Sequence, residues 1–389
     1  MTAFSPSAEH AAIREGVAQV CAPFPGAYWR DLDARRAYPE AFVKALSEAG
    51  YLSAMIPEEY GGSGLSLSAA AAILEEIHRS GCNAAACHAQ MYTMGTVLRH
   101  GSAEQKRQYL PAIAEGSLRL QAFGVTEPTS GTDTLALRTM ATRDGDAFVV
   151  NGQKIWTSRA EHSDLMLLLA RTTPRHSVEK RTDGLSVFLI DLRSLVGSGV
   201  TIKPIRTMMN HATTEVFFDN ARIPASSLIG EEGKGFRYIL SGMNAERILI
   251  AAECIGDAKW FLAKGAAYAK DRSVFGRPIG ANQGVQFPLA RAYAHTIAAE
   301  AIVYRAAAMY DAGLDPGIEA NSAKMLAADA SWEAGEACLQ THGGFGFAEE
   351  YDVERKFRET RLYQVAPIST NLILCFLAER ALGLPKSYG

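Results

Sequence analysis

The strongest structural signal in the chain comes from two stretches, Phe123-Gly124-Val125-Thr126-Glu127-Pro128-Thr129-Ser130-Gly131-Thr132-Asp133 and Lys154-Ile155-Trp156-Thr157-Ser158. They offer hydroxyl groups, backbone N–H groups at Gly131 and Thr132, and the aromatic plane of Trp156. A planar heteroaromatic cofactor needs hydrogen-bond donors at its edge and a flat apolar face. On these residues alone, an ordinary loop of a β domain is an equal alternative.

The segment that contains these stretches, from Leu120 to about Ile229, has the pattern of a β domain. Short β-prone runs occur at 147–150, 165–170, 185–190 and 214–218, and turn sequences such as Asp144-Gly145 and Asn151-Gly152 separate them. No helix-length periodic segment lies between the runs, which argues against βαβ crossovers and a parallel Rossmann sheet. We therefore predict an antiparallel β domain, in the form of a barrel.

The sequence on both sides of this segment is helical. Apolar residues recur with helical spacing at 41–46 and 69–77, and a further short helix is expected between Glu104 and Gly116. After Gly235, four longer amphipathic segments at 235–270, 281–313, 316–342 and 366–382 predict a four-helix bundle. The predicted fold class is α+β multidomain, with a helical N-terminal domain at 1–119, a middle β domain at 120–231 and a C-terminal bundle at 232–389.

Composition and motifs exclude several function classes. The 389 residues carry a formal net charge of −3, which argues against broad binding to nucleic acid or to anionic membrane. No run approaches the length of a membrane span, no signal-peptide layout is present, and six scattered cysteines without CxxC spacing indicate a reducing, cytoplasmic location.

The glycine clusters at 230–235 and 343–346 lack the context of a P-loop or a Rossmann fingerprint. His78, Cys82, Cys87 and His88 fit no zinc spacing, so we expect no metal site and interpret these residues as buried and structural.

Four motifs then follow one another along the chain. They are Thr126-Glu127-Pro128 with Gly131 and Asp133, Lys154 with Trp156, Arg272-Ser273-Val274-Phe275-Gly276 with Gln283, and Gln340-Thr341-His342-Gly343-Gly344-Phe345-Gly346 with Arg358. In this order the chain resembles the acyl-CoA dehydrogenase family from roughly residue 40 to the C-terminus. The resemblance implies a helical domain, a β-barrel domain, a C-terminal four-helix bundle and FAD as cofactor.

The resemblance also implies roles for individual residues. Those expected to bind the cofactor within one subunit are Phe123, Val125, Thr126, Gly131, Thr132, Trp156, Ser158 and Ser369. Thr132 would in addition border the CoA arm. Those expected to share the FAD of a neighbouring subunit are Arg272, Phe275 and Gln283 on one side of an interface, and Gln340, Gly343 and Gly344 on the other. Such sharing implies an obligatory homo-oligomer, and the family suggests a tetramer built as a dimer of dimers.

The reaction that the resemblance implies needs a carboxylate base, because the α-proton of an acyl thioester is a weak acid in water. In most of the family this base is the Glu of a YEGT-like element, but the matching run at 363–370 has Pro367 there. The isovaleryl- and long-chain-type members carry the Glu on the first long helix of the C-terminal domain, where this chain has Glu246. Although adjacent Glu and Arg residues on a helix usually form a solvated ion pair, we expect Glu246 to be the base.

Three residues near this base are expected to contact the substrate. Asn244 and Arg247 match positions that meet the CoA pantetheine or order the site. Pro367 stands where the family uses a backbone N–H to bind the thioester carbonyl, and proline has no N–H. The carbonyl must then be polarised by other donors, such as the ribityl hydroxyl of the flavin, or the local backbone must be shifted.

The function expected from the resemblance is FAD-dependent dehydrogenation of an acyl-CoA to the trans-2-enoyl-CoA, within fatty acid metabolism. Glu246 would remove the α-proton, flavin N5 would take the β-hydride, and an electron-transferring flavoprotein would accept the electrons. Two alternatives stay open. One is a flavin-dependent oxidase or monooxygenase on the same fold, and the other is a non-catalytic protein that binds FAD or acyl-CoA.

Overall fold

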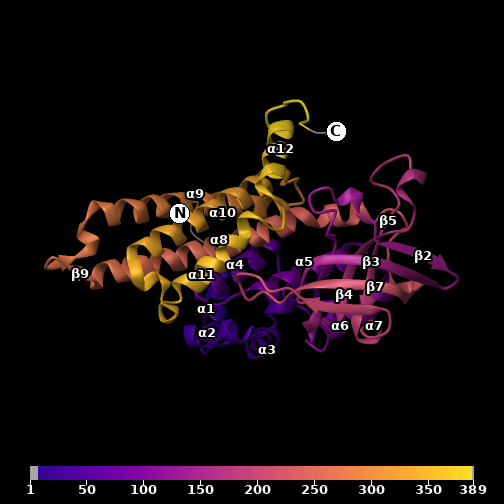
Figure 1. The fold of residues 1–389 in the computed structure, drawn as a ribbon, viewed down its shortest axis with the longest axis horizontal. Coiled ribbons are helices and arrows are strands. Elements are labelled where there is room, and N and C mark those ends of the chain that lie inside the picture. Colours follow the sequence, from indigo (N-terminus) through magenta and orange to yellow (C-terminus); the bar gives the residue numbers. More distant parts are fainter. Residues whose placement is uncertain (1–7, 388–389) are drawn as a thin grey trace. The chain divides into compact units, whose positions relative to one another are not determined.

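The computed structural model describes residues 8–387, which divide into two compact units. The first unit runs to Ala37 and adds Ser66–Ala84 and the chain from Asn244 onward. The second comprises Tyr38–Leu65 and Ala85–Met243. The predicted order of helices, strands and helices along the sequence is confirmed (Figure 1).

The second unit is built on an eight-stranded sheet. Its strands are β1 (Leu120–Gly124), β2 (Met140–Asp144), β3 (Ala147–Ser158), β4 (Leu165–Arg171), β5 (Leu185–Asp191), β6 (Val200–Pro204), β7 (Thr213–Pro224) and β8 (Leu228–Ile229). The strand order is β6-β7-β3-β2-β4-β5-β8, with β1 beside β4. The four sequence runs predicted as strands lie in β3, β4, β5 and β7.

The sheet is mainly antiparallel, as predicted, but two of its pairings are parallel. Strand β1 runs parallel to β4 over its whole length, and β2 meets β4 in parallel at Met140 and Arg171. Parallel neighbours require a long connection. Here the β2–β3 hairpin supplies it, since the chain forms this hairpin between β1 and β4. Sequence periodicity does not report such a connection.

Both faces of the sheet are covered, and β4 shows this most clearly. Every residue of β4 is buried, so its sequence is a continuous apolar run rather than an alternating one. Met166 and Leu168 join a core cluster with Phe148 and Phe188. Leu167 and Leu169 face the opposite side, where helices α5 (Ala85–His100) and α6 (Ala103–Ala114) cover the sheet with residues that include Met94, Val97, Leu110 and Ile113. The remaining helices of this unit are α3 (Glu40–Glu48) and the short α7 (Leu192–Leu195).

The first unit is helical apart from a small hairpin. Its helices are α1 (Ala8–Cys21), α2 (Gly26–Arg35), α4 (Leu67–Arg79), α9 (Gln283–Asp311), α10 (Gly317–His342), α11 (Val353–Thr360), α12 (Thr370–Arg380), and most of α8 (Gly235–Asp271), which begins in the second unit. The hairpin consists of β9 (Ser273–Val274) and β10 (Arg277–Pro278). The four predicted long helices correspond to α8, α9, α10 and α12.

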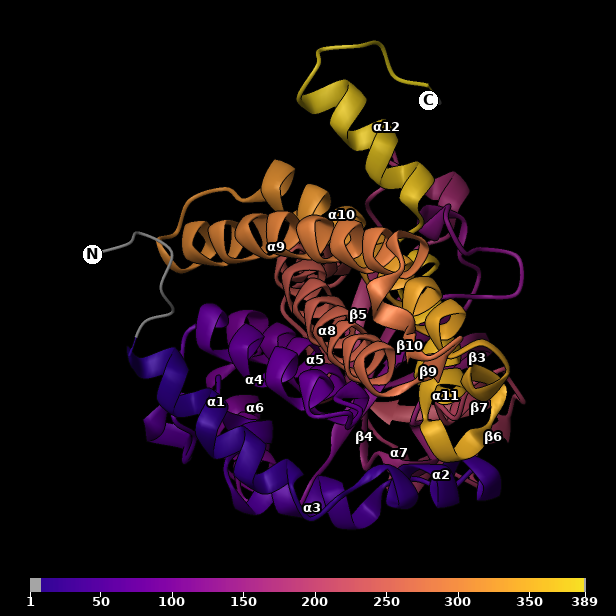
Figure 2. The same ribbon diagram turned by 90° about the vertical axis from the view of Figure 1, so that its left-hand side faces the viewer.

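Helices α8, α9 and α10 run alongside one another, as Figure 2 shows. Buried alanines line their contacts, because a small side chain allows two helix backbones to approach closely. Ala258, Ala292 and Ala334 belong to the same core cluster as Phe261 and Cys338. No helix in the described chain is long and apolar enough to cross a membrane.

An ionic network lies in the interior of the first unit. The ring Nδ1 of His78 on α4 lies 2.8 Å from Oδ1 of Asp257 on α8, and the ammonium of Lys356 on α11 pairs with the same carboxylate. All three side chains are fully buried. The charge of Lys356, followed by that of His78, holds the pKa of Asp257 below its usual value against the effect of burial. His78, Cys82, Cys87 and His88 are all buried.

Candidate active site

The end of β1 and the loop after it carry the first group of predicted site residues. Phe123, Val125 and Thr126 are half-buried, so each keeps part of its surface free for a ligand. The backbone N–H of Ile155 on β3 donates to the Thr126 carbonyl over 2.9 Å. The two stretches that stand out in the sequence therefore lie side by side in the structure.

A buried ion pair fixes this arrangement. The ammonium of Lys154 lies 2.8 Å from Oε1 of Glu127 and also donates to the Val125 carbonyl over 3.1 Å. Burial lowers the pKa of Lys154 to about 8. Against the opposing effect of burial, the Lys154 charge holds the pKa of the Glu127 carboxyl below its usual value. Two backbone N–H groups, from Arg138 and Thr139, also donate to Glu127 and complete its hydrogen bonds.

The loop at Gly131 and Thr132 is open to solvent. Glu127 and Ser130 exchange two backbone hydrogen bonds, of 3.0 and 3.2 Å, which close a tight turn just before it. Both Gly131 and Thr132 are exposed, and no atom lies within 4 Å of the place where a side chain at Gly131 would begin. The backbone here is therefore accessible to a ligand.

Trp156 presents its ring to solvent from an irregular position in β3. Its exposed fraction is 57%, and its φ of +60° is unusual for a residue other than glycine. The register of β3 against β7 shifts between Lys154 and Thr157, which places Trp156 at a bulge. Ser158 follows, half-buried and opposite Thr213. The bulge thus offers an aromatic plane and a hydroxyl group within three residues of each other.

Helix α8 carries the predicted base in the first unit. Glu246 is half-buried, and Arg247 beside it donates to Oδ1 of Asn244 over 3.0 Å. Burial lowers the pKa of Arg247, while the charge of Glu246 opposes that shift. The three residues expected from the sequence therefore form one local group in which a carboxylate and a guanidinium act on each other.

The segment before α12 contains two further predicted site residues of the first unit, Pro367 and Ser369. Pro367 is exposed, and the hydroxyl of Ser369 accepts a hydrogen bond from the backbone N–H of Leu372, which caps α12. The carbonyl of Ile368, between them, accepts a 2.9 Å hydrogen bond from the ammonium of Lys324 on α10. Sequence reasoning missed Lys324, although a lysine within the run Ala323-Lys324-Met325-Leu326-Ala327 breaks an otherwise apolar stretch.

The residues predicted to form a subunit interface are exposed. Arg272, Phe275 and Gln283 lie at and after the small hairpin, and the Phe275 side chain is fully exposed. Gln340, Gly343 and Gly344 are exposed at the end of α10. The Arg272 guanidinium lies 5.8 Å from the ring centre of Phe345, so the structure brings the hairpin next to the Gly343-Gly344 turn.

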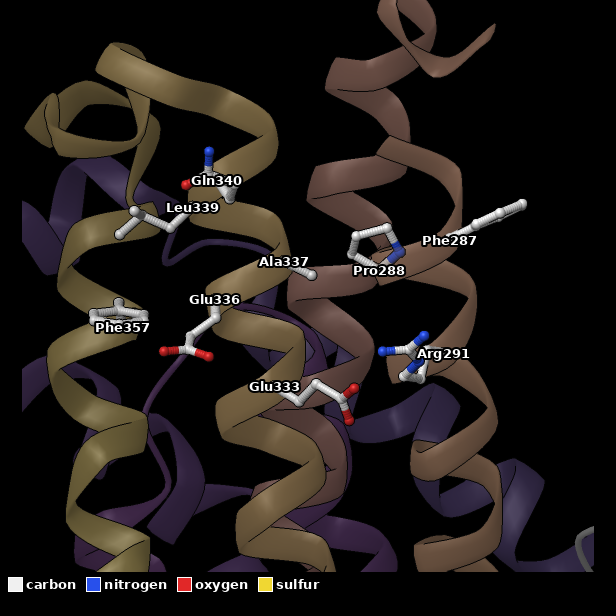
Figure 3. Close-up of a pocket in the computed structure, with 9 residues that line it drawn as sticks. All are labelled: Phe287, Pro288, Arg291, Glu333, Glu336, Ala337, Leu339, Gln340 and Phe357. Atoms are coloured by element: carbon white, nitrogen blue, oxygen red, sulfur yellow. The ribbon is translucent and has the colours of Figure 1, made fainter. Parts of the chain in front are cut away.

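A groove of about 550 Å³ continues this exposed surface (Figure 3). Phe287, Pro288 and Arg291 come from α9, and Phe357 comes from α11. The remaining lining residues belong to α10, namely Glu333, Glu336, Ala337, Leu339 and Gln340. Gln340, a predicted interface residue, therefore stands at the edge of a concave surface that combines apolar rings with charges of both signs.

The second unit thus combines a mainly antiparallel sheet with an exposed indole and hydroxyl groups beside a buried ion pair. Three family models match successive parts of the chain, namely the N-terminal domain of acyl-CoA dehydrogenase at 7–117, its middle domain at 122–221 and its C-terminal domain at 233–381. The chain belongs to the acyl-CoA dehydrogenase family.

Individual relatives agree with this assignment. The chain is 33% identical over 390 residues to the acyl-CoA dehydrogenase FadE12 of Mycobacterium tuberculosis, which covers 100% of this chain and 99% of the relative. Among solved structures, a glutaryl-coenzyme A dehydrogenase in complex with glutaryl-CoA is similar with a TM-score of 0.91, 29% identity, and coverage of 99% of this chain and 98% of that one. The prolyl acyl carrier protein oxidase AnaB is similar with a TM-score of 0.90, 25% identity, and coverage of 98% and 100%.

Family membership implies a flavin cofactor, and the side chains of the second unit suit one. The hydroxyls of Thr126, Thr132 and Ser158 can donate to or accept from the polar edge of a flavin ring system. The indole of Trp156 supplies a flat apolar face that suits the apolar face of a flavin ring system. Its exposure, on a backbone conformation that few tryptophans adopt, is the observation that most directly indicates a stacked ligand.

Removing that indole should weaken flavin binding. In Trp156→Ala, we expect the dissociation constant of FAD from the apoprotein to rise about tenfold, since stacking of an aromatic side chain on a heterocycle contributes roughly 1–3 kcal/mol. Quenching of flavin fluorescence on titration into apoprotein measures this constant. Trp156→Phe, which keeps a smaller aromatic plane, should lie between the two proteins. Equal affinity in all three would show that the indole does not contact the flavin.

Proposed function

We propose that this protein is an FAD-dependent acyl-CoA dehydrogenase that converts an acyl-CoA thioester to the trans-2-enoyl-CoA, with Glu246 as the base. One observation carries the assignment of the base. Position 367, where most of the family has its catalytic Glu, holds a proline, while Glu246 stands half-buried on α8 beside Arg247. A carboxylate that is only half-buried stays accessible to a substrate, as a general base must be.

The protein and its cofactor carry out different parts of the reaction. The Glu246 carboxylate takes the proton from the α-carbon and becomes a carboxylic acid, and the electron pair of that C–H bond forms the new double bond to the β-carbon. When bound, FAD supplies the acceptor for the hydride that leaves the β-carbon. Asn244 and Arg247 hold the pantetheine arm of CoA, so that the α-carbon is presented to Glu246 rather than to water.

The second unit would hold the flavin ring. In this proposal Phe123, Val125 and Thr126 border its pyrimidine edge, Trp156 packs on its face, and Ser158 reaches its central ring. Gly131 and Thr132 border the cofactor and the CoA arm, while Ser369 approaches the cofactor from the segment before α12. The Glu127–Lys154 pair keeps the loop after β1 attached to β3.

The proposal is tested by a panel of acyl-CoA thioesters, scored anaerobically by loss of the oxidised flavin absorbance. At least one straight, branched or cyclic acyl-CoA should reduce the flavin with formation of the enoyl product, and an electron-transferring flavoprotein should reoxidise it. If no thioester reduces a fully loaded flavin, although acyl-CoA binds, the protein is a binding protein and not a dehydrogenase.

An oxidase is the second candidate, and the similarity to AnaB supports it. In that case reduced flavin would pass its electrons to O₂ instead of to a protein acceptor. Measuring oxygen consumption during turnover, with and without an electron-transferring flavoprotein, separates the two. We expect turnover to depend on the protein acceptor, and rapid oxygen consumption in its absence would favour the oxidase.

We also propose that two copies of the chain share each FAD across the surface formed by Arg272, Phe275 and Gln283 on one copy, and by Gln340, Gly343 and Gly344 on the other. The fully exposed Phe275 and the groove beside Gln340 support this proposal, since burial of such apolar surface favours association. The family suggests that the complete assembly is a tetramer.

Phe275→Asp should therefore weaken the assembly. Burying one phenylalanine contributes about 1.5–3 kcal/mol, and a charge in its place adds a desolvation cost. Analytical ultracentrifugation should show smaller species, and the flavin content after gel filtration should fall. Val196→Asp replaces another exposed apolar side chain, near α7, and is the matched control. An unchanged mass and flavin content in Phe275→Asp would place the interface elsewhere.

A further inference from the structure

Helix α12 has the composition of a buried helix but lies at the surface of the first unit. Every residue from Leu372 to Leu377 is apolar or a cysteine, and no charge occurs in the helix before Glu379. Only Ile373 is buried, while its neighbours are half-buried or exposed. Both views show α12 projecting away from α9 and α10 (Figure 1, Figure 2). A helix that is apolar on all sides is ordinarily covered, so α12 requires a partner.

The exposed apolar surface extends beyond the helix itself. The Phe376 ring of α12 lies 3.5 Å from the place where a side chain at Gly317 would begin, so α12 contacts the start of α10. Four exposed apolar side chains on α12, just after it and beside Gly317 form what we call the α12 surface, namely Leu374, Leu382, Leu384 and Ile318. Their exposed fractions are 50%, 72%, 52% and 41%. Neighbouring apolar side chains that stay exposed together are typical of an interaction site.

The charges at the α12 surface favour a second copy of this chain as the partner. The only charged residues from Thr370 to Ser387 are Glu379, Arg380 and Lys386. A lipid surface would instead need a polar helix face rich in lysine and arginine. In a two-fold contact each surface meets its own copy, so that a residue pair forms twice. Glu379 and Arg380 lie side by side at the surface, 3.6 Å apart, and each can therefore face the other residue of a second copy.

The α12 surface is separate from the surface proposed to share FAD. Ile318 lies in the first turn of α10, whereas Gln340, Gly343 and Gly344 lie at the other end of that helix. A helix of 26 residues is about 39 Å long. Two copies joined at one end of α10 therefore leave the other end available for a second contact. Two different two-fold contacts on one chain can close an assembly of four copies.

We propose that a second copy of this chain covers the α12 surface, in a two-fold contact distinct from the one that shares FAD. The proposal rests on the proposed function only through that shared FAD, and it does not depend on which reaction the flavin performs. Covering α12 also holds the segment before it, because the Ser369 hydroxyl caps the helix by accepting a hydrogen bond from the backbone N–H of Leu372.

The test is the mass of the FAD-loaded protein in solution, measured by analytical ultracentrifugation over a range of protein concentrations. In Leu374→Asp the mass should fall to half that of wild type, because a carboxylate then replaces an apolar contact in both copies. The flavin content should stay that of wild type, since the copies that share FAD remain joined. Leu382→Asp should give the same result, and it carries the test if Leu374→Asp does not fold.

Two further variants serve as controls. Val196→Asp places the same charge on a side chain of nearly equal exposure, 51%, in the second unit, and its mass should not change. Leu374→Asp combined with Phe275→Asp removes both proposed contacts, so this double variant should sediment as single copies.

Each outcome has a definite meaning. A mass that stays at the wild-type value in both Leu374→Asp and Leu382→Asp overturns the proposal, and so does an equal fall in Val196→Asp. Loss of flavin together with the fall in mass overturns it as well, because α12 would then belong to the contact that shares FAD. None of these results decides the dehydrogenase reaction, which is overturned only if no acyl-CoA reduces the loaded flavin.

Discussion

Glu246→Gln is expected to slow flavin reduction by acyl-CoA by about 10²–10⁴-fold, the usual contribution of a positioned general base. Glutamine has nearly the shape of glutamate but cannot accept the α-proton at neutral pH. Because Glu246 is proposed to contact the substrate and not the cofactor, the flavin content of the variant should equal that of wild type. Anaerobic stopped-flow absorbance after mixing with a reactive acyl-CoA gives the rate.

The control for this variant is Glu232→Gln, which removes an exposed carboxylate just before α8 that pairs with Arg143. It should react like wild type. A Glu246→Gln enzyme that keeps more than about a tenth of the wild-type rate would contradict the assignment of the base, since 1.4 kcal/mol corresponds to a factor of ten. The α-proton would then have to go to a different group.

Lys154→Met is expected to lower the free energy of unfolding by about 3–5 kcal/mol, because it leaves the Glu127 carboxylate buried without its cation. The side chain of Lys154 has an exposed fraction of 0% and that of Glu127 only 5%, so water cannot replace the lost partner. Since the same ammonium also binds the Val125 carbonyl, the loop after β1 should lose its attachment. We expect weaker retention of FAD as a second effect. Urea denaturation and the flavin content after dialysis measure the two effects.

The double variant Glu127→Gln/Lys154→Met provides the control. Without a buried charge, it should regain part of the lost unfolding free energy, while FAD retention should stay low because the Val125 carbonyl still lacks its donor. If the double variant were as unstable as Lys154→Met, the loss would come from packing of the lysine stem rather than from an unpaired carboxylate. A Lys154→Met protein as stable as wild type would contradict the ion-pair argument altogether.

The fold could be predicted well where a pattern is long and regular. The long segments of α8, α9 and α10 were predicted within a few residues, because each is an uninterrupted run of many residues between clear turn sequences. Helix α11 was missed, since its eight residues are mostly charged and only Val353 and Phe357 mark a face. Parallel pairing of β1 with β4 was missed because strand direction depends on a distant hairpin and not on local sequence.

The site, too, could be predicted only in part from the sequence. Motifs identified residues by their type and order, and the structure then showed which of them have fixed surroundings, such as Trp156 at its bulge. The sequence indicated that His78 and His88 are buried, but not that charged side chains such as Lys154 and Lys324 are. Lys154 and Glu127 belong to the sequence motifs, but no role was predicted for either. Lys324 was not considered, because a lysine on a helix is normally interpreted as exposed. Burial depends on the whole fold, and only the structure reports it.

The proline at position 367 has a consequence for how this enzyme can change over evolutionary time. In our proposal the proton acceptor belongs to a long, packed helix, while the segment before α12 has no acid–base duty. Helix α8 is constrained by its buried neighbours, whereas an exposed turn tolerates substitution. Mutations around residues 365–368 can therefore change the surroundings of the thioester without removing the proposed base, so that the two parts of the site can evolve separately.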